Sequence, residues 1–383
     1  MATSNPKKTI RLGMVGGGQG AFIGAVHRIA SRIDNRFKLV AGALSSNPER
    51  ALASGRELGL DDDRSYTDYK EMARHEADLK DGIEAVAIVT PNHLHAPIAS
   101  AFLSAGIHVI CDKPLTTNLD EAIDLEKKVH QSKKLFILTH NYTGYPVIRQ
   151  AREIIANGTL GNIRIVRAEY AQDWLTEAAD DDNKQATWRS DPKMAGSGAI
   201  GDIGTHAFNL ANFVSGLETE QLSAELSRFV PNRQLDDNAH INIRYKGGAR
   251  GTIWASQVAP GNENSLTLRI YGEKGGLEWS QEDPNYLWHT PFGEPKRLIT
   301  RSGNGASDIA NRVSRVPGGH PEGYLEGFAT IYSEAAIAIE AYKTGASLPE
   351  GHHINTIEDG VYGMKFIDAC QRSSINNASW VSL

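Results

Sequence analysis

The chain has few cysteines, no long apolar run and no excess of positive charge, and each absence excludes a class of protein. Cys111 and Cys370 are the only cysteines in 383 residues and neither lies in a Cys-x-x-Cys pair, so we expect two reduced, buried thiols rather than a disulfide framework or a zinc knuckle. No run of about 18 apolar residues is present to cross a membrane. A net charge of -6, from 40 Lys and Arg against 46 Asp and Glu, disfavours nucleic-acid binding.

The beginning of the chain gives no sign of a leader. Residues 1–8 are polar and run directly into an apolar segment at 10–15, which predicts the absence of a signal peptide. With its reduced thiols the protein is expected to be cytoplasmic and to contact no membrane. Its length exceeds what one hydrophobic core usually supports, so we expect two domains. The 37 glycines indicate sharp turns or backbone that approaches a ligand.

Short apolar segments alternate with helical patterns over the first 140 residues. Repeated strand–helix–strand units predict a doubly wound parallel sheet of the Rossmann type, an α/β fold that binds ligands at the carboxyl ends of its strands. We assign this predicted dinucleotide-binding domain to residues 1–144. The expected strands are residues 10–15, 38–44, 85–90, 108–111 and 135–139.

From residue 145 the pattern changes to alternating strands and hairpins. Lys-Gly-Gly at 246–248 and Glu-Lys-Gly at 273–275 each separate two strand-like segments, as hairpin turns do. Residues 145–383 are therefore predicted to form an α+β domain for substrate binding and oligomerisation, with a large, open, mainly antiparallel sheet and a C-terminal helix able to pack back on the first domain. The polar stretches 177–185 and 301–317 are predicted to be mobile loops.

A glycine-rich turn follows the first predicted strand. Residues 16–21 read Gly-Gly-Gly-Gln-Gly-Ala, and a predicted helix begins near residue 22. In this position the pattern predicts a dinucleotide site, because glycines let the backbone approach a pyrophosphate and a helix N-terminus favours anions. The alternative is a structural turn without a ligand. The cofactor contacts expected here are Gly16, Gly18, Gln19, Gly20, Ala21, Phe22 and Ile23.

The end of the second strand leaves NAD and NADP open. NAD-binding proteins usually place a carboxylate there for the ribose 2′-hydroxyl, whereas this chain has Ser45 and Ser46, with Arg50 a helical turn later. These three side chains could hold a 2′-phosphate, which leans slightly to NADP. Alternatively, the serines bond the ribose hydroxyls of NAD and Arg50 is solvated.

Polar residues also follow three other predicted strands. They are Thr-Pro-Asn-His-Leu-His at 90–95, Cys-Asp-Lys-Pro at 111–114 and His-Asn-Tyr at 140–142. Carboxyl ends of parallel strands meet at one rim of the sheet, so these side chains should gather at a ligand. Further on, a glycine-rich stretch at 196–204 leads to Asp202 and His206, which share one face if they lie on a helix.

Taken together, these motifs resemble the glucose–fructose oxidoreductase and inositol dehydrogenase family, Gfo/Idh/MocA, over essentially the whole chain. The resemblance implies a Rossmann domain, a C-terminal domain with an open sheet, and oxidation or reduction of a sugar or cyclitol. It implies a homodimer or homotetramer formed through that sheet. The family's catalytic lysine falls on Lys113 and its Asp/His pair on Asp202 and His206. One departure is Asp112, where the family usually has Glu.

The chemistry of hydride transfer fits these three residues. A carbinol needs a base for its proton and a donor that fixes its oxygen; His206 titrates in the useful range, and Lys113 can donate or relay a proton. Asp202 would orient or share that proton. Each residue also has a structural alternative: a helix N-cap for Asp202, a satisfied helix histidine for His206 and a solvated loop charge for Lys113.

Further contacts are expected with less support from the motifs. Asn141 should approach the nicotinamide, and the pair Trp188 and Arg189 resembles a family position close to it. Histidine pairs at 93/95 and 352/353 lack a completing carboxylate or thiolate, so no metal is expected. The remaining cofactor contacts are predicted at Thr90, Pro91, Asn92, His95, Asp112 and Lys113. The substrate contacts are predicted at Lys113, Tyr142, Asp173, Trp174, Asp202, His206 and His320, with Asp237 and Asn238 in segments that could face the pocket.

The sequence thus predicts an NAD(P)-dependent oxidoreductase acting on a secondary hydroxyl of a sugar, glycoside or cyclitol. One alternative is a redox-neutral enzyme with tightly bound NAD(H), such as an epimerase, an isomerase or an oxidative glycoside-cleaving enzyme. A non-catalytic dinucleotide sensor is an alternative of another class, but it would not require Lys113, Asp202 and His206 together.

Overall fold

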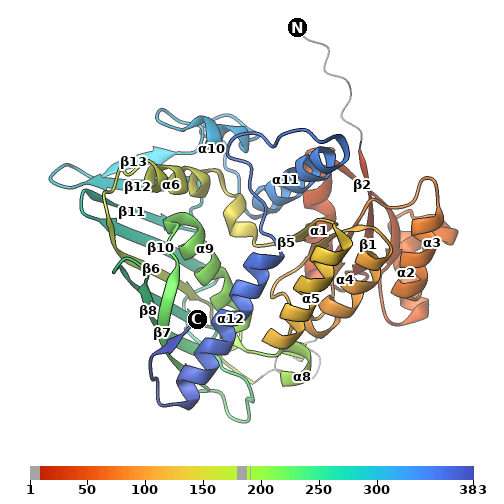
Figure 1. Ribbon diagram of the computed structural model, residues 1–383, viewed down its shortest axis with the longest axis horizontal. Coiled ribbons are helices and arrows are strands. Elements are labelled where there is room, and N and C mark those ends of the chain that lie inside the picture. Colours follow the sequence, from red (N-terminus) through yellow and green to blue (C-terminus); the bar gives the residue numbers. More distant parts are fainter. Residues whose placement is uncertain (1–8, 179–187, 190) are drawn as a thin grey trace, which may run out of the picture. The chain divides into compact units, whose positions relative to one another are not determined.

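The computed structural model describes residues 9–178, 188–189 and 191–383, and its chain divides into two compact units (Figure 1). Two predictions fall at least partly outside the described residues. They are the absence of a signal peptide, drawn from residues 1–8, and the mobile loop at 177–185, of which residues 179–185 are not described. The first unit comprises residues 1–116, 120–141 and 324–361, and the second comprises 117–119, 142–323 and 362–383. The second of the three segments of the first unit ends at residue 141, and residues 324–361 form its third segment. The domain bounds 1–144 and 145–383 stay a prediction.

The first unit contains a five-stranded sheet in the order β2-β1-β3-β4-β5, in which every pairing is parallel. All residues of β3 and β4 are buried, as expected for strands covered on both faces. The doubly wound parallel sheet predicted from the sequence is confirmed. The strands are β1 (Ile10–Gly16), β2 (Phe37–Ala43), β3 (Ala85–Val89), β4 (His108–Cys111) and β5 (Phe136–Leu138).

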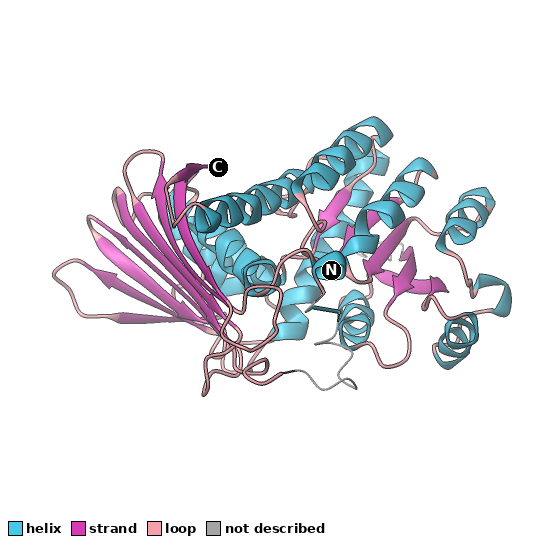
Figure 2. Cartoon of the chain, turned by 90° about the horizontal axis from the view of Figure 1, so that it is seen from below, coloured by secondary structure: helices cyan, strands magenta, loops and turns pink. Residues whose placement is uncertain are grey.

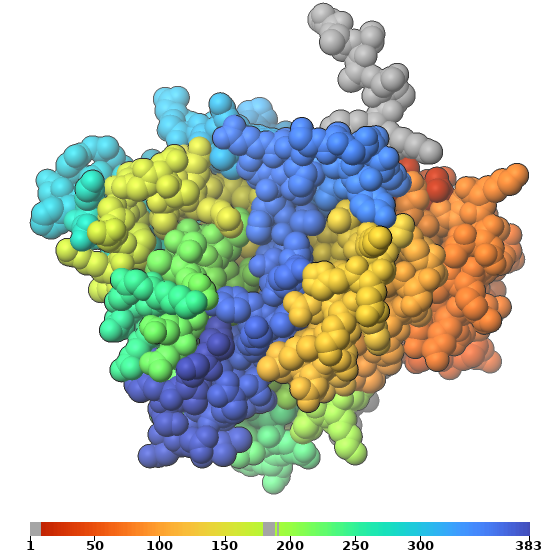
Figure 3. Space-filling model, viewed as in Figure 1, coloured from red at the N-terminus to blue at the C-terminus, as the bar shows by residue number. Residues whose placement is uncertain are grey.

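The helices of the first unit follow their sequence signals. Asn47 accepts a hydrogen bond from the Arg50 N–H and so caps the N-terminus of α2, as its side chain favours. Helix α11 packs on α1, where Phe328 and Tyr332 join the core. Helix α5 lies at the surface, in gold in Figure 3. The helices are α1 (Phe22–Ile33), α2 (Pro48–Glu57), α3 (Tyr69–Asp78), α4 (His95–Ser104), α5 (Leu119–Ser132) and α11 (Tyr324–Thr344).

The second unit contains a nine-stranded sheet in the order β13-β12-β11-β10-β6-β9-β8-β7-β14. Only β6 and β9 pair in parallel; the other neighbours are antiparallel. Both predicted hairpin turns are present. The strands are β6 (Ile163–Ala171), β7 (Thr219–Ser227), β8 (Asn238–Tyr245), β9 (Arg250–Ser256), β10 (Ser265–Gly272), β11 (Gly275–Ser280), β12 (Tyr286–Pro291), β13 (Arg297–Thr300) and β14 (Val381–Ser382).

Helices cover one face of this sheet, as Figure 2 shows. Helix α9 packs on β6, β9 and β10, and α6 reaches β12. Along β6, Val166, Ala168 and Tyr170 are buried while Ile165 and Arg167 are exposed, so the strand has one covered and one open face. The predicted open, mainly antiparallel sheet is confirmed. The helices are α6 (Pro146–Ala156), α8 (Pro192–Ala195), α9 (Thr205–Ser215), α10 (Asp308–Arg312) and α12 (Ile357–Ile375), whose first residues belong to the first unit.

The stretch 301–317, predicted to be a mobile loop, consists of turns and loop around the short helix α10, and buried side chains anchor it. The Arg301 guanidinium is buried and pairs with Glu322 at 3.0 Å. It also donates to the carbonyls of Val316 and Pro317, and Ser307 caps α10 within the stretch. Arg301 is therefore the buried anchor of the segment.

In the described part of the chain, no helix combines the length and the apolarity needed to span a bilayer. Cys111 and Cys370 are both buried and free, as predicted, and burial raises the pKa of each thiol. Their thiolate forms are therefore disfavoured, and neither cysteine has the character of a reactive nucleophile.

Candidate active site

The glycine-rich turn joins β1 to α1, and its glycines meet two different requirements. Gly16, Gly17 and Gly20 have φ between +71° and +80°, a region that other residues rarely enter. Gly18 instead lacks room, because a Cβ there would lie 2.6 Å from the Leu44 carbonyl oxygen. The sequence pattern predicted that the backbone at Gly18 approaches a bound pyrophosphate. Within the protein, the backbone at Gly18 also lies close to Leu44, directly after β2.

A further close approach within the turn was not predicted. A Cβ on Gly24 would lie 2.4 Å from the Gly17 Cα, so the first turn of α1 presses directly on the glycine turn. This contact holds the helix N-terminus over residues 17–20, where its N–H groups and dipole favour an anion. The Phe22 side chain, 66% exposed, stands at the start of that helix, and Ile23 packs partly against the core.

The predicted ribose contacts lie between β2 and α2. The Gln19 N–H donates to Ser54 Oγ at 3.1 Å and its side chain donates to Glu57, which joins the glycine turn to α2. Ser45 Oγ accepts the Asn47 N–H, while Ser46 and Arg50 are exposed. The three side chains predicted to select the cofactor are thus at the surface or half-buried, at the N-terminus of α2.

The ends of β3, β4 and β5 are tied together by polar contacts. Asp112 Oδ1 accepts hydrogen bonds from the Lys113 N–H and the Thr139 hydroxyl, both at 2.9 Å. The His95 ring nitrogens lie 2.8 Å from the Pro114 carbonyl and 2.9 Å from the Thr90 carbonyl. Asp112 therefore braces β4 against β5, and His95, predicted as a cofactor contact, braces β4 against β3. Of the other predicted contacts at this rim, Asn92 and Asn141 are buried and Pro91 and Lys113 are half-buried.

His140 lies close to Lys113 at this rim and is held neutral. Burial, and secondly the positive charge of Lys113, lower the pKa of His140 to about 3. His108, at the start of β4, has its pKa lowered to about 4, mainly by burial. Its Nδ1 accepts the Leu135 N–H at 3.0 Å, a bond that a protonated ring could not accept.

These shifts predict that the protein loses stability in acid. An unfolded histidine takes up a proton near pH 6.5 and native His108 only near pH 4, so the free energy of unfolding falls as the pH falls through that window. At about 1.4 kcal/mol per pKa unit, His108 contributes of the order of 3 kcal/mol. The free energy of unfolding, measured with a denaturant at pH 5 and at pH 7, should differ less between the two pH values for His108→Gln than for the wild type. The control His240→Gln, at an exposed position, should show the same pH dependence as the wild type. If the free energy of unfolding changes equally with pH in all three proteins, the prediction is contradicted.

In the second unit, Asp202 lies in a single π-helical turn (Ile200–Gly204), and His206 lies in the first turn of α9, which begins at Thr205. Such turns are rare and are often found at functional sites. The alternative role of Asp202 as the N-cap of α9 is excluded, because Asp202 lies inside the preceding π-helical turn and Gly204 is the N-cap. Both residues therefore lie on consecutive turns of one helical segment.

The glycines before this turn allow a buried carboxylate to hold it. Asp236 Oδ1 accepts the Gly198 N–H at 2.9 Å and Oδ2 accepts the Ile200 N–H at 2.7 Å. A Cβ on Gly198 would lie 1.8 Å from the Asp236 carbonyl oxygen. Glycine at position 198 is therefore required by the close packing of the chain against Asp236.

Two donors meet at one carboxylate oxygen of Asp202. Gln257 Nε2 donates to Asp202 Oδ2 at 2.8 Å, and Arg189 Nε donates to the same atom at 3.2 Å. The sequence reasoning missed Gln257, because it predicts a strand over residues 250–258, and that range includes Gln257. The observed β9 ends at Ser256, so Gln257 is a polar residue directly after a strand, the same signal that singled out the other rim residues.

An aromatic and amide network surrounds His206. Its ring lies edge-on to Tyr142, with centroids 4.8 Å apart, and the Tyr142 hydroxyl lies 2.6 Å from the Tyr170 hydroxyl. The Tyr170 hydroxyl donates to Asn264 at 2.8 Å. Tyr170 and Asn264 were not predicted, since they lie inside β6 and before β10, where the sequence reads as ordinary strand and turn.

The indole rings of Trp174 and Trp188 lie beside Arg189. Its guanidinium carbon is 4.3 Å from the Trp188 ring centroid and 6.0 Å from that of Trp174. Trp174 is 39% exposed, and its Nε1–H donates to the Gln172 side chain. Exposed aromatic faces next to charged groups suit the apolar face and hydroxyls of a carbohydrate. The predicted residues Trp174, Trp188, Arg189 and Asp202 are therefore brought together.

Other predicted residues are occupied elsewhere. Asp173 Oδ2 accepts the Gly261 N–H. Asp237 is buried, accepts the N–H groups of Phe229 and Val230, and pairs with Arg233. His320 is exposed in the segment anchored by Arg301, to which its carbonyl oxygen is bonded. These contacts give Asp237 a structural role rather than the pocket-facing role that the sequence suggested.

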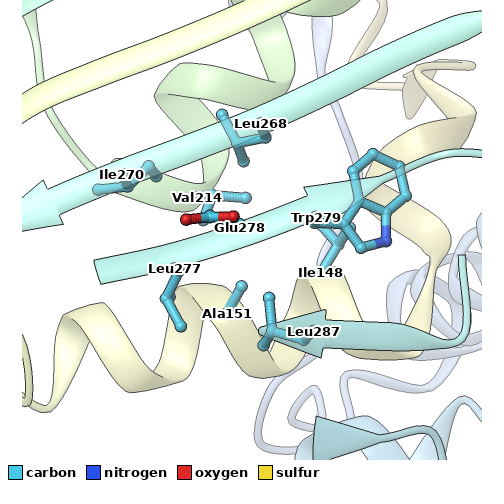
Figure 4. Close-up of a pocket in the computed structure, with 9 residues that line it drawn as sticks. All are labelled: Ile148, Ala151, Val214, Leu268, Ile270, Leu277, Glu278, Trp279 and Leu287. Carbon is cyan, nitrogen blue, oxygen red and sulfur yellow. The ribbon is translucent and has the colours of Figure 1, made fainter. Parts of the chain in front are cut away.

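A pocket of the second unit lies between α6, α9 and strands β10, β11 and β12 (Figure 4). Apart from Glu278 its lining is apolar, with Ile148, Val214 and Leu268 among the side chains drawn in the close-up. It includes none of the predicted site residues. Without a set of polar groups it has no means of orienting a hydroxylated ligand.

Comparison with known families identifies the two halves of the chain. A model described as the NAD-binding Rossmann fold of the Gfo/Idh/MocA oxidoreductase family matches residues 10–151. A second, the Gfo/Idh/MocA C-terminal domain, matches residues 148–278. The resemblance noted in the sequence is confirmed.

The relatives that match over nearly the full length include an oxidoreductase, an inositol dehydrogenase homologue and a levoglucosan dehydrogenase. An oxidoreductase structure from Sinorhizobium meliloti is 61% identical, with a TM-score of 0.90 over 98% of this chain and 100% of that chain. An inositol dehydrogenase homologue from Azotobacter vinelandii, solved with NAD+, is 36% identical, with a TM-score of 0.95 over 98% of each chain. Levoglucosan dehydrogenase from Pseudarthrobacter phenanthrenivorans is 31% identical over 98% of each chain.

Proposed function

We propose that this chain, which belongs to the Gfo/Idh/MocA oxidoreductase family, is an NAD-dependent dehydrogenase of a secondary hydroxyl on a cyclitol or sugar. One observation carries the proposal: a carboxylate fixed by two donors, Asp202, precedes a histidine by one helical turn. Binding of NAD alone would not require this pair, so the pair favours an enzyme over a nucleotide sensor.

The first unit fits a dinucleotide. The left-handed glycines of the turn and the N-terminus of α1 would hold the pyrophosphate, and Ser45 and Ser46 would bond the ribose. The bound nicotinamide would supply the hydride acceptor. NAD is proposed rather than NADP, because the inositol dehydrogenase homologue was solved with NAD+ and also with NADH and myo-inositol. The slight lean to NADP drawn from the sequence rested on the missing acid and on three side chains able to hold a 2′-phosphate, Ser45, Ser46 and Arg50.

The residues of this chain divide the remaining work. Lys113 would donate a hydrogen bond to the carbinol oxygen and hold it as the carbon loses hydride. His206 would take the hydroxyl proton, and Asp202 would accept a hydrogen bond from a hydroxyl of the substrate. The exposed indole of Trp174 would pack on the ring's apolar face. Asn141, Tyr142 and Trp188 remain proposed contacts of the cofactor or substrate.

The open face of the second sheet is proposed to form a homodimer or homotetramer. Ile165 is exposed on that face, beside strands whose other face is covered by helices, and an uncovered sheet bearing apolar side chains is typical of an interface. Light scattering of the purified protein measures the mass; a monomer at micromolar concentration contradicts this part of the proposal.

The function is tested with purified protein, NAD+ or NADP+, and a panel that includes myo-inositol, levoglucosan and glucose. Absorbance at 340 nm should rise with at least one polyol, and faster with NAD+ than with NADP+. Protein that carries stoichiometric NAD(H) and converts a sugar without net absorbance change would instead favour a redox-neutral enzyme. No conversion of any cyclitol or sugar by either route contradicts the proposal.

A further inference from the structure

Gln257 is a buried amide directed at the proposed acid–base pair. It follows β9, and its side chain is 2% exposed. Its backbone is fixed on both sides, since its N–H donates to the Asp237 carbonyl at 2.9 Å and its carbonyl accepts the Leu175 N–H. The Nε2–Asp202 Oδ2 distance of 2.8 Å fixes the orientation of the amide, because an ionised carboxylate only accepts and a reversed amide would place two oxygens in contact.

Arg189 acts on the same oxygen as Gln257. Its Nε–H lies 3.2 Å from Asp202 Oδ2, so one carboxylate oxygen receives one neutral and one charged donor. Both hydrogen bonds favour the ionised form of Asp202. The Gln257 amide has no ionisation of its own, whereas a carboxylate in its place would compete with Asp202 for a proton. The choice of an amide here therefore bears on the charge of Asp202.

We infer that Gln257 is a positioning residue that keeps Asp202 an anion, so that Asp202 binds a substrate hydroxyl while His206 alone takes the proton. This rests on the proposed dehydrogenase function. In the step considered, the C–H bond breaks with its electron pair going to NAD+, the O–H proton goes to the His206 imidazole, and a C=O bond forms. Asp202 keeps its charge throughout and neither gains nor loses a proton.

The sharpest test is Gln257→Glu, which places a second carboxylate against Asp202. Two carboxylates in contact share a proton until the pH rises above the upper ionisation of the pair. At low pH the shared proton replaces the amide donor, and activity should approach that of the wild type. At higher pH kcat/KM should fall by 10-fold or more (about the value of a hydrogen bond to a charged group), giving a bell-shaped profile. The kcat/KM of the wild type should rise with pH and then stay level.

Two further variants separate positioning from packing. Gln257→Leu keeps the volume and removes the donor, so it should lose about 10- to 100-fold in kcat/KM without an alkaline limb. Gln234→Glu adds the same charge at an exposed position of the same unit and should leave the profile unchanged. A Gln257→Glu profile that is parallel to the wild type at every pH would overturn the inference.

A measurement of thermal stability, which does not depend on enzyme turnover, tests this inference separately from the proposed function. The buried carboxylate pair should make the Tm of Gln257→Glu fall, relative to Gln234→Glu, as the pH rises above the pair's upper ionisation. This Tm response together with an inactive wild type would reject the proposed function and keep the pairing of Gln257 with Asp202. A Tm difference that does not change with pH would reject the pairing.

Discussion

Lys113→Met should lower kcat for polyol oxidation by about 10²- to 10⁴-fold, the usual contribution of a positioned proton donor, and should leave the fold intact. Lys113 is half-buried in the segment that Asp112 and His95 brace against the neighbouring strands. Methionine keeps most of the length and apolar stem of lysine but removes the ammonium. Because the brace is made by the backbone and by Asp112, the loss should be of charge and donor rather than of local structure.

The measurement pairs steady-state kinetics with a titration of His140. The charge of Lys113 is the second cause of the lowered His140 pKa, so that pKa should rise in Lys113→Met when followed by NMR. Lys365→Met, at an exposed position of α12, should change neither quantity. A Lys113→Met protein with a raised His140 pKa but kcat within threefold of the wild type would show that the charge is lost and is not needed for catalysis.

What could be predicted from the sequence depended on local patterns. The five parallel strands were recognisable because β3 and β4 are continuous apolar runs, and the hairpins because Gly247 and Gly248 supply positive φ between two strands. By contrast β7, Thr-Glu-Gln-Leu-Ser-Ala-Glu-Leu-Ser, was missed. Its residues have weak strand propensity, and its place in the sheet comes from pairing with β8.

The sequence motifs pointed to the candidate site residues, but not to the residues that hold them in place. Lys113, Asp202 and His206 stand in short recognisable segments. The Gln257 and Asp236 contacts join residues 36 to 55 positions apart, and no local pattern encodes such pairings. The same limit explains Asp237 and Arg301, whose charges suggested a pocket and a loop. Their backbone partners, Phe229 for Asp237 and Val316 for Arg301, make them structural.

His206→Gln should lower kcat by about 10²- to 10⁴-fold, as expected for loss of a general base, and should remove the rise of kcat/KM with pH. His206 is 8% exposed and lies edge-on to Tyr142, so glutamine can fill most of its space and still form hydrogen bonds. What glutamine cannot do is take up a proton near neutral pH, which in the described mechanism only the imidazole does. The matched control is His240→Gln, at an exposed position of β8, which should keep the full profile.

Asp202→Asn provides the contrast that assigns the roles within the pair. Asparagine can still present its carbonyl oxygen to Gln257 and Arg189, but it cannot carry the negative charge. If Asp202 binds a hydroxyl as an anion, this variant should raise KM and lower kcat while the ionisation of His206 stays visible in the pH profile, shifted downward by loss of the neighbouring negative charge. If instead Asp202→Asn removes the pH dependence and His206→Gln keeps it, the carboxylate is the base, and the proposed roles of Asp202 and His206 are wrong.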